Sequence, residues 1–393
     1  MSRSAVGQEF VKFFVSLRVT VVLLVLSMVL VFWATLAQVK LGVWGVQEHF
    51  FRTFFVLAKI PGTEIPVPVF PGGYFLGGLL LINLVAAHLY RFKFAWGKTG
   101  VQLTHFGLIL LLVGELLTSL LQEEYQLRLD QDQARNYSES FRDNEVAIID
   151  TTDPDFDNVV AIPESMIARG TEVQHPQLPF RVIPRFYLPN AALGRKAAEA
   201  GRDFGIPELA NQGLGPQIAV VPQPITYKDT ERNLPMAYVE LVGAEGSIGT
   251  WLVSPMLVAP QTFDYGGRSW RITFRFERTY KPFSLELLEL RHDVYPGTEI
   301  PKNFSSRVRI QTPDGSSDRE ALIYMNNPLR YDGLTFYQYQ MDSANGFSVL
   351  QVVRNPSWPI PYVACALMGL GLTIQFGIHL FAFARRRTRA ATA

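Results

Sequence analysis

The sequence is poor in cysteine and has almost no net charge. Its one cysteine, Cys365, lies inside an apolar run, and 36 basic residues balance 35 acidic ones to a formal charge of +1. A single cysteine excludes an intramolecular disulfide and a CxxC redox pair. Cys365 is therefore expected to be a small apolar residue packed in a helix. The near-neutral charge gives no indication of a nucleic-acid partner.

Apolar residues gather in four runs of the length that crosses a bilayer. A helix needs about 20 apolar residues to span the hydrocarbon core. The predicted transmembrane helices cover about 15–37, 71–90, 101–121 and 358–384. These runs divide the chain into an N-terminal membrane region, 1–121, an outer domain, 122–357, and a C-terminal helix with a basic tail, 358–393.

Basic residues near the ends of these runs indicate the orientation. Lys and Arg favour the cytoplasmic side of a membrane. They occur before or at the start of the first run, between the second and third runs, and after the fourth: Arg3, Lys12, Arg18, Arg91, Lys93, Lys98, Arg385, Arg386, Arg387 and Arg389. All three groups fall on one side if both termini are cytoplasmic. The outer domain is then extracytoplasmic, which in a bacterium means periplasmic.

Alternating polar and apolar segments fill the outer domain, separated by turn signals such as Asp314–Gly315 and Asp332–Gly333. This pattern predicts β-strands. The expected strands are 145–150, 217–221, 237–242, 248–253, 270–278, 285–291, 307–311, 321–324, 335–340 and 347–354. An alanine-rich stretch, 191–200, predicts one short helix. The fold class is therefore an α + β membrane protein, with four transmembrane helices and a sandwich or barrel-like β domain between the third and fourth.

Three histidines lie in the apolar runs. His88 precedes Arg91 by three residues, His105 follows Lys98 by seven, and His379 precedes Arg385 by six. At about 1.5 Å per residue, all three are expected within roughly 5–10 Å of the cytoplasmic boundary. Ionisable groups at membrane depth often mark functional sites, and neutral imidazole suits iron ligation. Alternatively, histidines near helix ends lie among lipid headgroups and bind nothing, which applies most to His88 and His379.

Glu115 is a further charged residue within the third run, ten residues beyond His105. This residue has two interpretations: a structural hydrogen bond, with Asn83 as the expected partner, or a role in proton or ligand binding. His49, His175 and His292 lie outside the runs and are expected to be surface or turn residues.

Several segments together resemble one known family. The quoted stretches are Ser16–Gln38, Thr104–Gly114, Tyr295–Gly297, Pro301–Ser306, Met325–Gln340 and Arg354–Pro359, and the most specific is MNNPLRYDGLTFYQYQ at 325–340. In these stretches the chain resembles the ResB family, also called CcsB, of the System II machinery for cytochrome c biogenesis.

The resemblance implies a subunit that handles haem b. Such proteins act with a ResC/CcsA-type membrane partner, which carries a tryptophan-rich loop, to move haem across the bacterial inner membrane. The haem is then attached covalently to the CxxCH motif of apocytochrome c. His105 resembles the family histidine that ligates haem jointly with a histidine of the partner, whereas His88 and His379 rest on their depth alone.

The six tryptophans of this chain are dispersed. The resemblance therefore implies a non-catalytic subunit without catalytic residues of its own. Contacts with apocytochrome c or the partner are expected on the outer domain, at Tyr295, Asn326, Pro328, Tyr337 and Gln338. Two alternatives remain at this stage: a membrane-anchored thiol oxidoreductase, which the single cysteine disfavours, and an apocytochrome-binding scaffold without a haem site.

Overall fold

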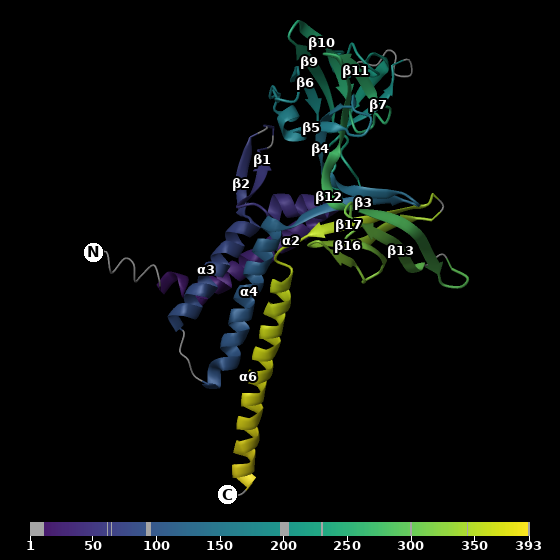
Figure 1. The fold of residues 1–393 in the computed structure, drawn as a ribbon. Coiled ribbons are helices and arrows are strands. Elements are labelled where there is room, and N and C mark those ends of the chain that lie inside the picture. Colours follow the sequence, from purple (N-terminus) through teal and green to yellow (C-terminus); the bar gives the residue numbers. More distant parts are fainter. Residues whose placement is uncertain are drawn as a thin grey trace. The chain divides into compact units, whose positions relative to one another are not determined.

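The computed structural model describes residues 12–60, 62–63, 65–91, 96–196, 204–228, 231–298, 301–343 and 345–391 (Figure 1). Arg3 and Lys93, which entered the orientation argument, lie outside the described residues. The chain forms two compact units. The helical unit contains Met1–Glu123, Tyr227–Asp229 and Arg354–Ala393, and the β unit contains Glu124–Thr226 and Thr230–Val353.

Four helices of the helical unit are long and apolar enough to cross a membrane, judged by length and composition. They are α2 (Leu17–Val46), α3 (Gly73–Arg91), α4 (Thr99–Leu121) and α6 (Pro359–Ala391). A five-residue π-helix, Gln47–Phe51, follows α2, and a short 3-10 turn, Trp96–Lys98, precedes α4. A hairpin of β1 (Phe55–Lys59) and β2 (Pro66–Pro71) joins α2 to α3. The apolar helices predicted from the sequence are therefore confirmed.

A seam of glycines joins α4 to α6. Gly100, Gly107 and Gly114 recur every seven residues on α4 and are all buried. A Cβ on Gly100 would lie 2.5 Å from the carbonyl oxygen of Gly371, and one on Gly107 would lie 2.7 Å from Cγ of Met368. Because no side chain intervenes, the two backbones approach closely, as small residues allow between membrane helices.

Asn83 joins α3 to α2. Its side chain is 2% exposed, accepts a hydrogen bond from the Thr20 hydroxyl at 2.6 Å and donates one to the Phe14 carbonyl at 2.6 Å. The predicted pairing of Asn83 with Glu115 is therefore wrong, because the side chain of Asn83 bonds to Thr20 of α2 and to Phe14 instead.

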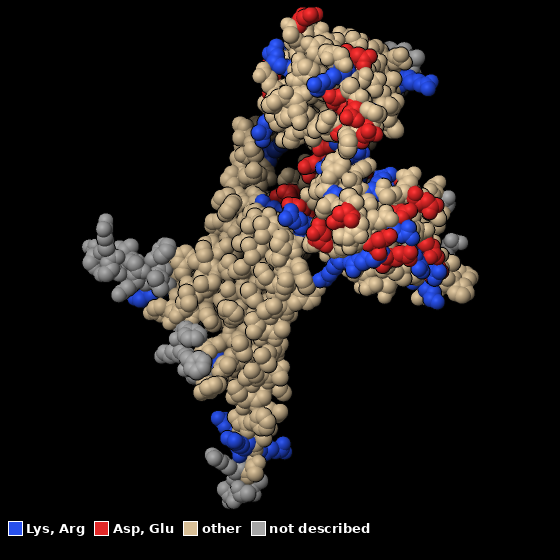
Figure 2. All heavy atoms as spheres, in the orientation of Figure 1, with Lys and Arg blue, Asp and Glu red and all other residues tan. Residues whose placement is uncertain are grey.

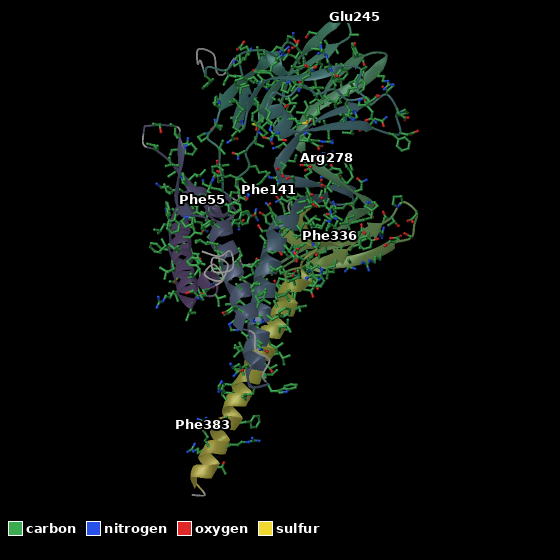
Figure 3. All side chains as sticks on the ribbon, turned by 90° about the vertical axis from the view of Figure 1, so that its left-hand side faces the viewer. Phe55, Phe141, Glu245, Arg278, Phe336 and Phe383 are labelled. Atoms are coloured by element: carbon green, nitrogen blue, oxygen red, sulfur yellow. The ribbon has the colours of Figure 1, made fainter. Side chains whose placement is uncertain are left out.

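The β unit has a barrel-like part built on a ten-stranded sheet. Its main strand order is β14-β13-β12-β4-β3-β17-β16-β15, and β14 lies against β16, so the sheet nearly closes. Its strands are β3 (Glu123–Asp130), β4 (Ala134–Asp150), β12 (Arg268–Val294), β13 (Pro301–Gln311), β14 (Asp318–Tyr324), β15 (Leu329–Tyr331), β16 (Leu334–Asp342) and β17 (Phe347–Arg354). Side chains such as Leu129, Leu287 and Phe336, all fully buried, fill its core. Phe336 is labelled in Figure 3.

The same long strands, β4 and β12, continue into a second part of the β unit, a sandwich. There they pair with β5 (Asn158–Pro163) and β11 (Gln261–Tyr265) and pack against a sheet of order β10-β9-β6. The second sheet contains β6 (Arg181–Leu188), β9 (Met236–Gly243) and β10 (Gly246–Val253), and a short helix, α5 (Glu164–Ala168), follows β5. Trp251 and Trp270 lie in the core between the sheets. The predicted β-rich domain is thus confirmed, with sandwich and barrel-like parts together.

The structure changes one expectation about strands and the one expectation of a short helix. The segments 270–278 and 285–291 are one strand, β12, interrupted by irregularities at Phe276/Arg278 and Tyr280/Leu285. The helix expected over 191–200 is wrong where the structure describes it, since Ala191–Arg195 form strand β7, which pairs with β8 (Ile218–Pro222), and residues 197–200 lie outside the described residues. Pairing with β8 outweighs the high helix propensity of alanine, because tertiary contacts override local propensity.

Candidate functional site

His105 presents an exposed imidazole on an apolar helix, α4, six residues after its first residue, Thr99. Its Nδ1 lies 2.7 Å from the carbonyl oxygen of Val101, one turn earlier in the same helix. A carbonyl only accepts hydrogen bonds, so Nδ1 carries the proton and donates it. The lone pair of the neutral ring is then on Nε2. A backbone carbonyl that fixes the tautomer in this way is a common support for metal-ligating histidines.

His88 lies beside His105, on the neighbouring helix α3. The two ring centroids are 6.3 Å apart and the ring planes make an angle of 23°. At the other end of the same helix pair, the hydroxyls of Tyr74 and Ser119 are 3.2 Å apart. Tyr74 precedes His88 by 14 residues, and Ser119 follows His105 by 14 residues. The antiparallel register of α3 and α4 therefore brings the two imidazoles together.

His379 does not share this level. Its Nε2 lies 2.9 Å from Nε2 of Gln375, one turn earlier in α6. The antiparallel seam places Gly371 of α6 opposite Gly100 of α4, so His379 and His105 extend from this crossing in opposite directions, about 20 Å apart along the axis. The prediction of three imidazoles at one depth is wrong for His379, because α6 continues for several turns past the start of α4.

Apolar side chains and the lysine Lys98 lie close to the His88–His105 pair in the sequence. Leu89, Val101 and Phe106 expose large parts of their side chains next to the two rings in sequence. Lys98 precedes His105 by seven residues, two helical turns, which places both on one side of the α4 axis. Among the described residues no group of three or more His, Cys, Asp or Glu side chains could hold a metal ion. The site therefore offers two imidazoles rather than a carboxylate or thiolate cage.

Glu115 and Cys365 are both exposed on their helices. The carboxylate of Glu115 makes no hydrogen bond or ion pair with the part of the chain that the structure describes. No contact therefore supports either the structural hydrogen bond or the proton- or ligand-binding role considered for this residue. Cys365 was expected to be packed inside the helix bundle, and this expectation is wrong, since its side chain is exposed on α6. Ala364, the residue before it, is the one that packs against α4.

The remaining histidines contact aromatic rings or loops. His49 lies edge-on to Tyr227, with ring centroids 5.4 Å apart. Trp44 stacks on the same tyrosine ring, with centroids 5.7 Å apart. His292 stacks on Phe304, its partner across the β12–β13 pair, at 4.5 Å. His49, His175 and His292 are all exposed, as predicted from the sequence.

The five residues predicted to contact apocytochrome c or a partner lie on the barrel-like part. Tyr295 is 50% exposed and Tyr337 is 39% exposed. Asn326 has a positive φ of 61° in the turn after β14, and Pro328 follows in the same turn. Gln338, by contrast, is engaged internally: its amide accepts a hydrogen bond from the Ser306 hydroxyl at 2.7 Å and donates one to Ser348 at 3.0 Å. Tyr295, Asn326 and Tyr337 are thus exposed, whereas Pro328 and Gln338 are partly buried.

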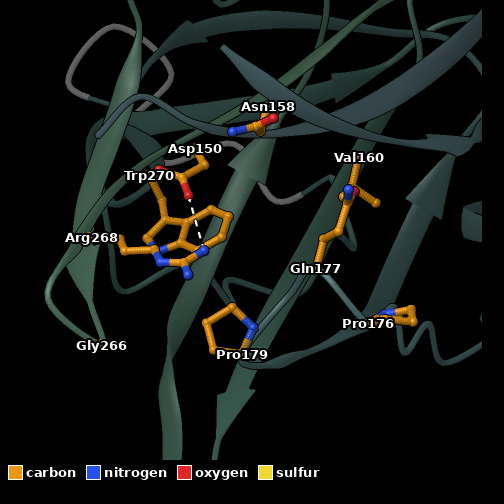
Figure 4. A pocket seen from close by; sticks show the side chains of 9 residues that line it. All are labelled: Asp150, Asn158, Val160, Pro176, Gln177, Pro179, Gly266, Arg268 and Trp270. Carbon is orange, nitrogen blue, oxygen red and sulfur yellow. Dashed lines mark hydrogen bonds and ion pairs between the residues drawn. The ribbon is translucent and has the colours of Figure 1, made fainter. Parts of the chain in front are cut away.

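Two pockets of the β unit were not predicted from the sequence. One, in the sandwich part, has a volume of about 480 Å³ and is lined by Asp150, Asn158, Val160, Pro176, Gln177, Pro179, Gly266, Arg268 and Trp270 (Figure 4). Arg268 and Asp150 form an ion pair of 3.2 Å there, and the Thr152 hydroxyl, followed by Arg268, holds the pKa of Asp150 below its usual value. The other, also about 480 Å³, lies in the barrel-like part beside Phe283 and Tyr331. Their residues come from distant segments, so no local pattern marks them.

These features define a protein with four apolar helices of membrane length, a pair of helical histidines and a large β unit. Residues 257–345 match the family model of the ResB-like family. Protein NrfI of Wolinella succinogenes is 34% identical over 91 residues, which are 23% of this chain and 10% of that protein. Over these residues the chain is similar to the ResB-like family, in agreement with the resemblance found in the sequence. The matched residues lie in the β unit, from the loop before β11 to the turn after β16.

Proposed function

We propose that this protein binds haem b at His105 and, with a ResC/CcsA-type partner, delivers it across the bacterial inner membrane to apocytochrome c. The observation that carries the proposal is the state of His105. Its ring is exposed on an apolar helix, and the Val101 carbonyl holds Nδ1 so that the lone pair of Nε2 is available to a metal. An imidazole without such a ligand is costly at membrane depth, and a bond to iron offsets that cost.

In this proposal the four helices cross the inner membrane and the β unit is periplasmic. The helical unit holds haem from the cytoplasmic side, while the β unit receives apocytochrome c on its barrel-like part. Two observations favour that part: the family match falls on it, and Tyr295 and Tyr337 are exposed there. The protein acts as a binding subunit, and the covalent attachment requires the partner.

The alternative of a thiol oxidoreductase has little support. Although Cys365 is exposed on α6, it is the one cysteine of the sequence, and thiol–disulfide exchange within a chain needs a second thiol. The scaffold alternative requires no membrane histidine, so it differs from the proposal in one measurable respect: the haem content of the protein.

The test is the haem that copurifies with the full chain and its partner. His105→Ala should lower that haem and abolish holocytochrome c formation, while the protein inserts and accumulates normally. Added imidazole should restore part of both, because it fills the vacant position on iron, and simple misfolding would not respond. Full haem content and full activity in His105→Ala would refute the haem site in this chain and favour the scaffold.

A further inference from the structure

We infer that His88 is the second axial ligand, so that this chain alone holds haem between two of its own imidazoles before the partner engages it. The inference rests on the proposed function and deepens it at the same site. Its basis is the pairing of His88 with His105 across α3 and α4, which the family resemblance does not imply.

The separation of the rings suits a metal between them. Metal–imidazole bonds are about 2 Å long, so two imidazoles on opposite sides of one metal have their centroids about 6 Å apart. The observed centroid distance is 6.3 Å. The same distance also occurs between simply packed rings. What favours ligation is the position: the two polar rings lie side by side on apolar helices, where a bond to a metal would offset part of the cost of placing them in lipid.

The two histidines are held in place by packing on both sides. Asn83 fixes α3 to α2 through two hydrogen bonds of 2.6 Å. The glycine seam fixes α4 to α6, and the Tyr74–Ser119 contact sets the register between α3 and α4. Sites on rigid helices with supported side chains keep ligand geometry better than sites on loops. The ligand pair is therefore preorganised in the chain without a partner.

The surroundings match the chemistry of an iron porphyrin that bears carboxylates. Val101, Phe106 and Leu89 offer exposed apolar side chains to the faces of the macrocycle. Lys98, two turns before His105 on the same side of α4, lies about 10 Å from it along the axis. Its ammonium can pair with a carboxylate at the cytoplasmic edge of the macrocycle. These side chains suit the binding of a flat, apolar ring with a negatively charged edge.

Transfer to the partner then requires one ligand exchange. The iron bond to one of this chain's imidazoles breaks as a bond to a partner imidazole forms, and both leaving and entering rings are neutral. No electron is transferred and no covalent bond of the porphyrin changes. We assign the leaving position to His88, since the Val101 carbonyl holds His105 in its ligating tautomer.

The experiment uses the full chain, purified without the partner in lipid nanodiscs and titrated with hemin. Absorption and electron paramagnetic resonance spectra report the number and kind of axial ligands. The unaltered protein should give a six-coordinate, low-spin, bis-imidazole spectrum. His88→Ala and His105→Ala should each give a five-coordinate, high-spin species and bind hemin about tenfold or more weakly. His379→Ala, a matched change of a helical histidine outside the pair, should leave the spectrum unaltered.

Two further variants distinguish the loss of an iron ligand from misfolding of the protein. His88→Met retains a ligand and should restore a six-coordinate, low-spin spectrum with a sulfur–iron band. In a Cys365→Ala background, the double change His88→Cys and His105→Cys should be cross-linked within one chain by a short dithiol-reactive reagent. Failure of that cross-link would contradict the pairing itself.

The outcomes separate the inference from the proposed function. If His105→Ala loses the low-spin spectrum and His88→Ala keeps it, the inference is overturned and the haem site at His105 stands. If the chain without its partner binds no hemin, whereas the complex does, the inference is also overturned. If neither histidine affects hemin binding in the chain or in the complex, both proposals fail.

Discussion

Lys281 is buried in β12 and forms no ion pair with a carboxylate among the residues that the structure describes. Its side chain is 9% exposed, and Nζ donates hydrogen bonds to the Ser138 hydroxyl at 2.5 Å and to the Thr279 carbonyl at 3.4 Å. Burial lowers the pKa of Lys281 from 10.5 to about 8. A shift of this size corresponds to about 3 kcal/mol of penalty for the charged form.

The pH dependence of stability follows from the direction of this shift. Below about pH 8 both the folded and unfolded states carry the proton, and the folded protein bears the full penalty. Between about pH 8 and 10.5 the unfolded state binds more protons, so the contribution of Lys281 to stability rises with pH. Lys281→Met should therefore raise the urea midpoint of the β unit at pH 7, and the gain should shrink toward pH 10. Lys302→Met, at an exposed lysine, serves as the control, and an equal gain at both pH values would contradict the argument.

The histidines and other polar residues of the helices were found from the sequence, but their partners were not. Hydropathy marks His88, His105, Asn83 and Glu115 because each interrupts an apolar run. Which of them face each other depends on the rotation and register of separate helices, and counting residues from the nearest basic side chain does not contain that information. The depth derived from this residue count was wrong for His379 because α6 extends past α4. His88 and His105 meet because each lies 14 residues from the Tyr74–Ser119 contact along its own helix, and α3 and α4 are antiparallel.

Among the elements, the contact between α4 and α6 depends most directly on residue size. Gly107 and Gly114 are seven residues apart on one face of α4, and α6 occupies that face. A Cβ on Gly107 would lie 2.8 Å from the Ala364 carbonyl oxygen, whereas a Cβ on Gly77 of α3 would meet nothing within 4 Å. Gly107, in the contact with α6, and Gly77, which faces open space, therefore form a matched pair for substitution.

We expect Gly107→Leu to force α4 and α6 apart and to lower stability by about 1–3 kcal/mol, the usual result of overpacking. Gly77→Leu should have little effect, since leucine is tolerated on an apolar helix surface. Thermal unfolding of the full chain in detergent, followed by far-ultraviolet circular dichroism, compares the two. Because α4 carries His105, Gly107→Leu should also weaken hemin binding. Equal melting temperatures for the two variants would show that the seam does not hold the helices together.

The strands were predicted best where burial alternates and worst where it does not. All ten segments expected from alternation coincide with strands, two of them within β12, although the first residue of 217–221 lies in a 3-10 turn. The sequence analysis missed β1 and β2, and the prolines of β2 (Pro66, Pro68 and Pro71) obscure its pattern. It also missed β3, β5, β6, β11 and β15, and it predicted a helix where β7 lies. β12 was divided because Pro282 and its neighbours form an irregularity between Tyr280 and Leu285. Strand order came from the structure alone, since alternation does not specify which strands pair.

At the scale of the whole molecule, charge is distributed differently in the two units. Figure 2 shows the helices of the helical unit almost free of charged side chains, with Lys and Arg gathered at the C-terminal end of α6, while acidic and basic side chains are interspersed on the β unit. Arg385, Arg386 and Arg387 are exposed at that end. Such a one-sided basic cluster favours the cytoplasmic side.

The orientation predicts a specific pair of reporter results. Gly315 lies in the exposed turn between β13 and β14, where its φ is 71° and a Cβ would meet nothing within 4 Å, so an insertion there should be tolerated. A reporter active only in the periplasm should function at Gly315 and remain silent when fused after Ala393, and a cytoplasmic reporter should give the opposite result. Changing the three arginines at 385–387 to glutamine should reduce this asymmetry, because Lys and Arg next to a helix end determine its orientation. The reverse pattern would place the β unit in the cytoplasm and refute its proposed contact with apocytochrome c, while hemin binding by the His88–His105 pair would be unaffected by the orientation.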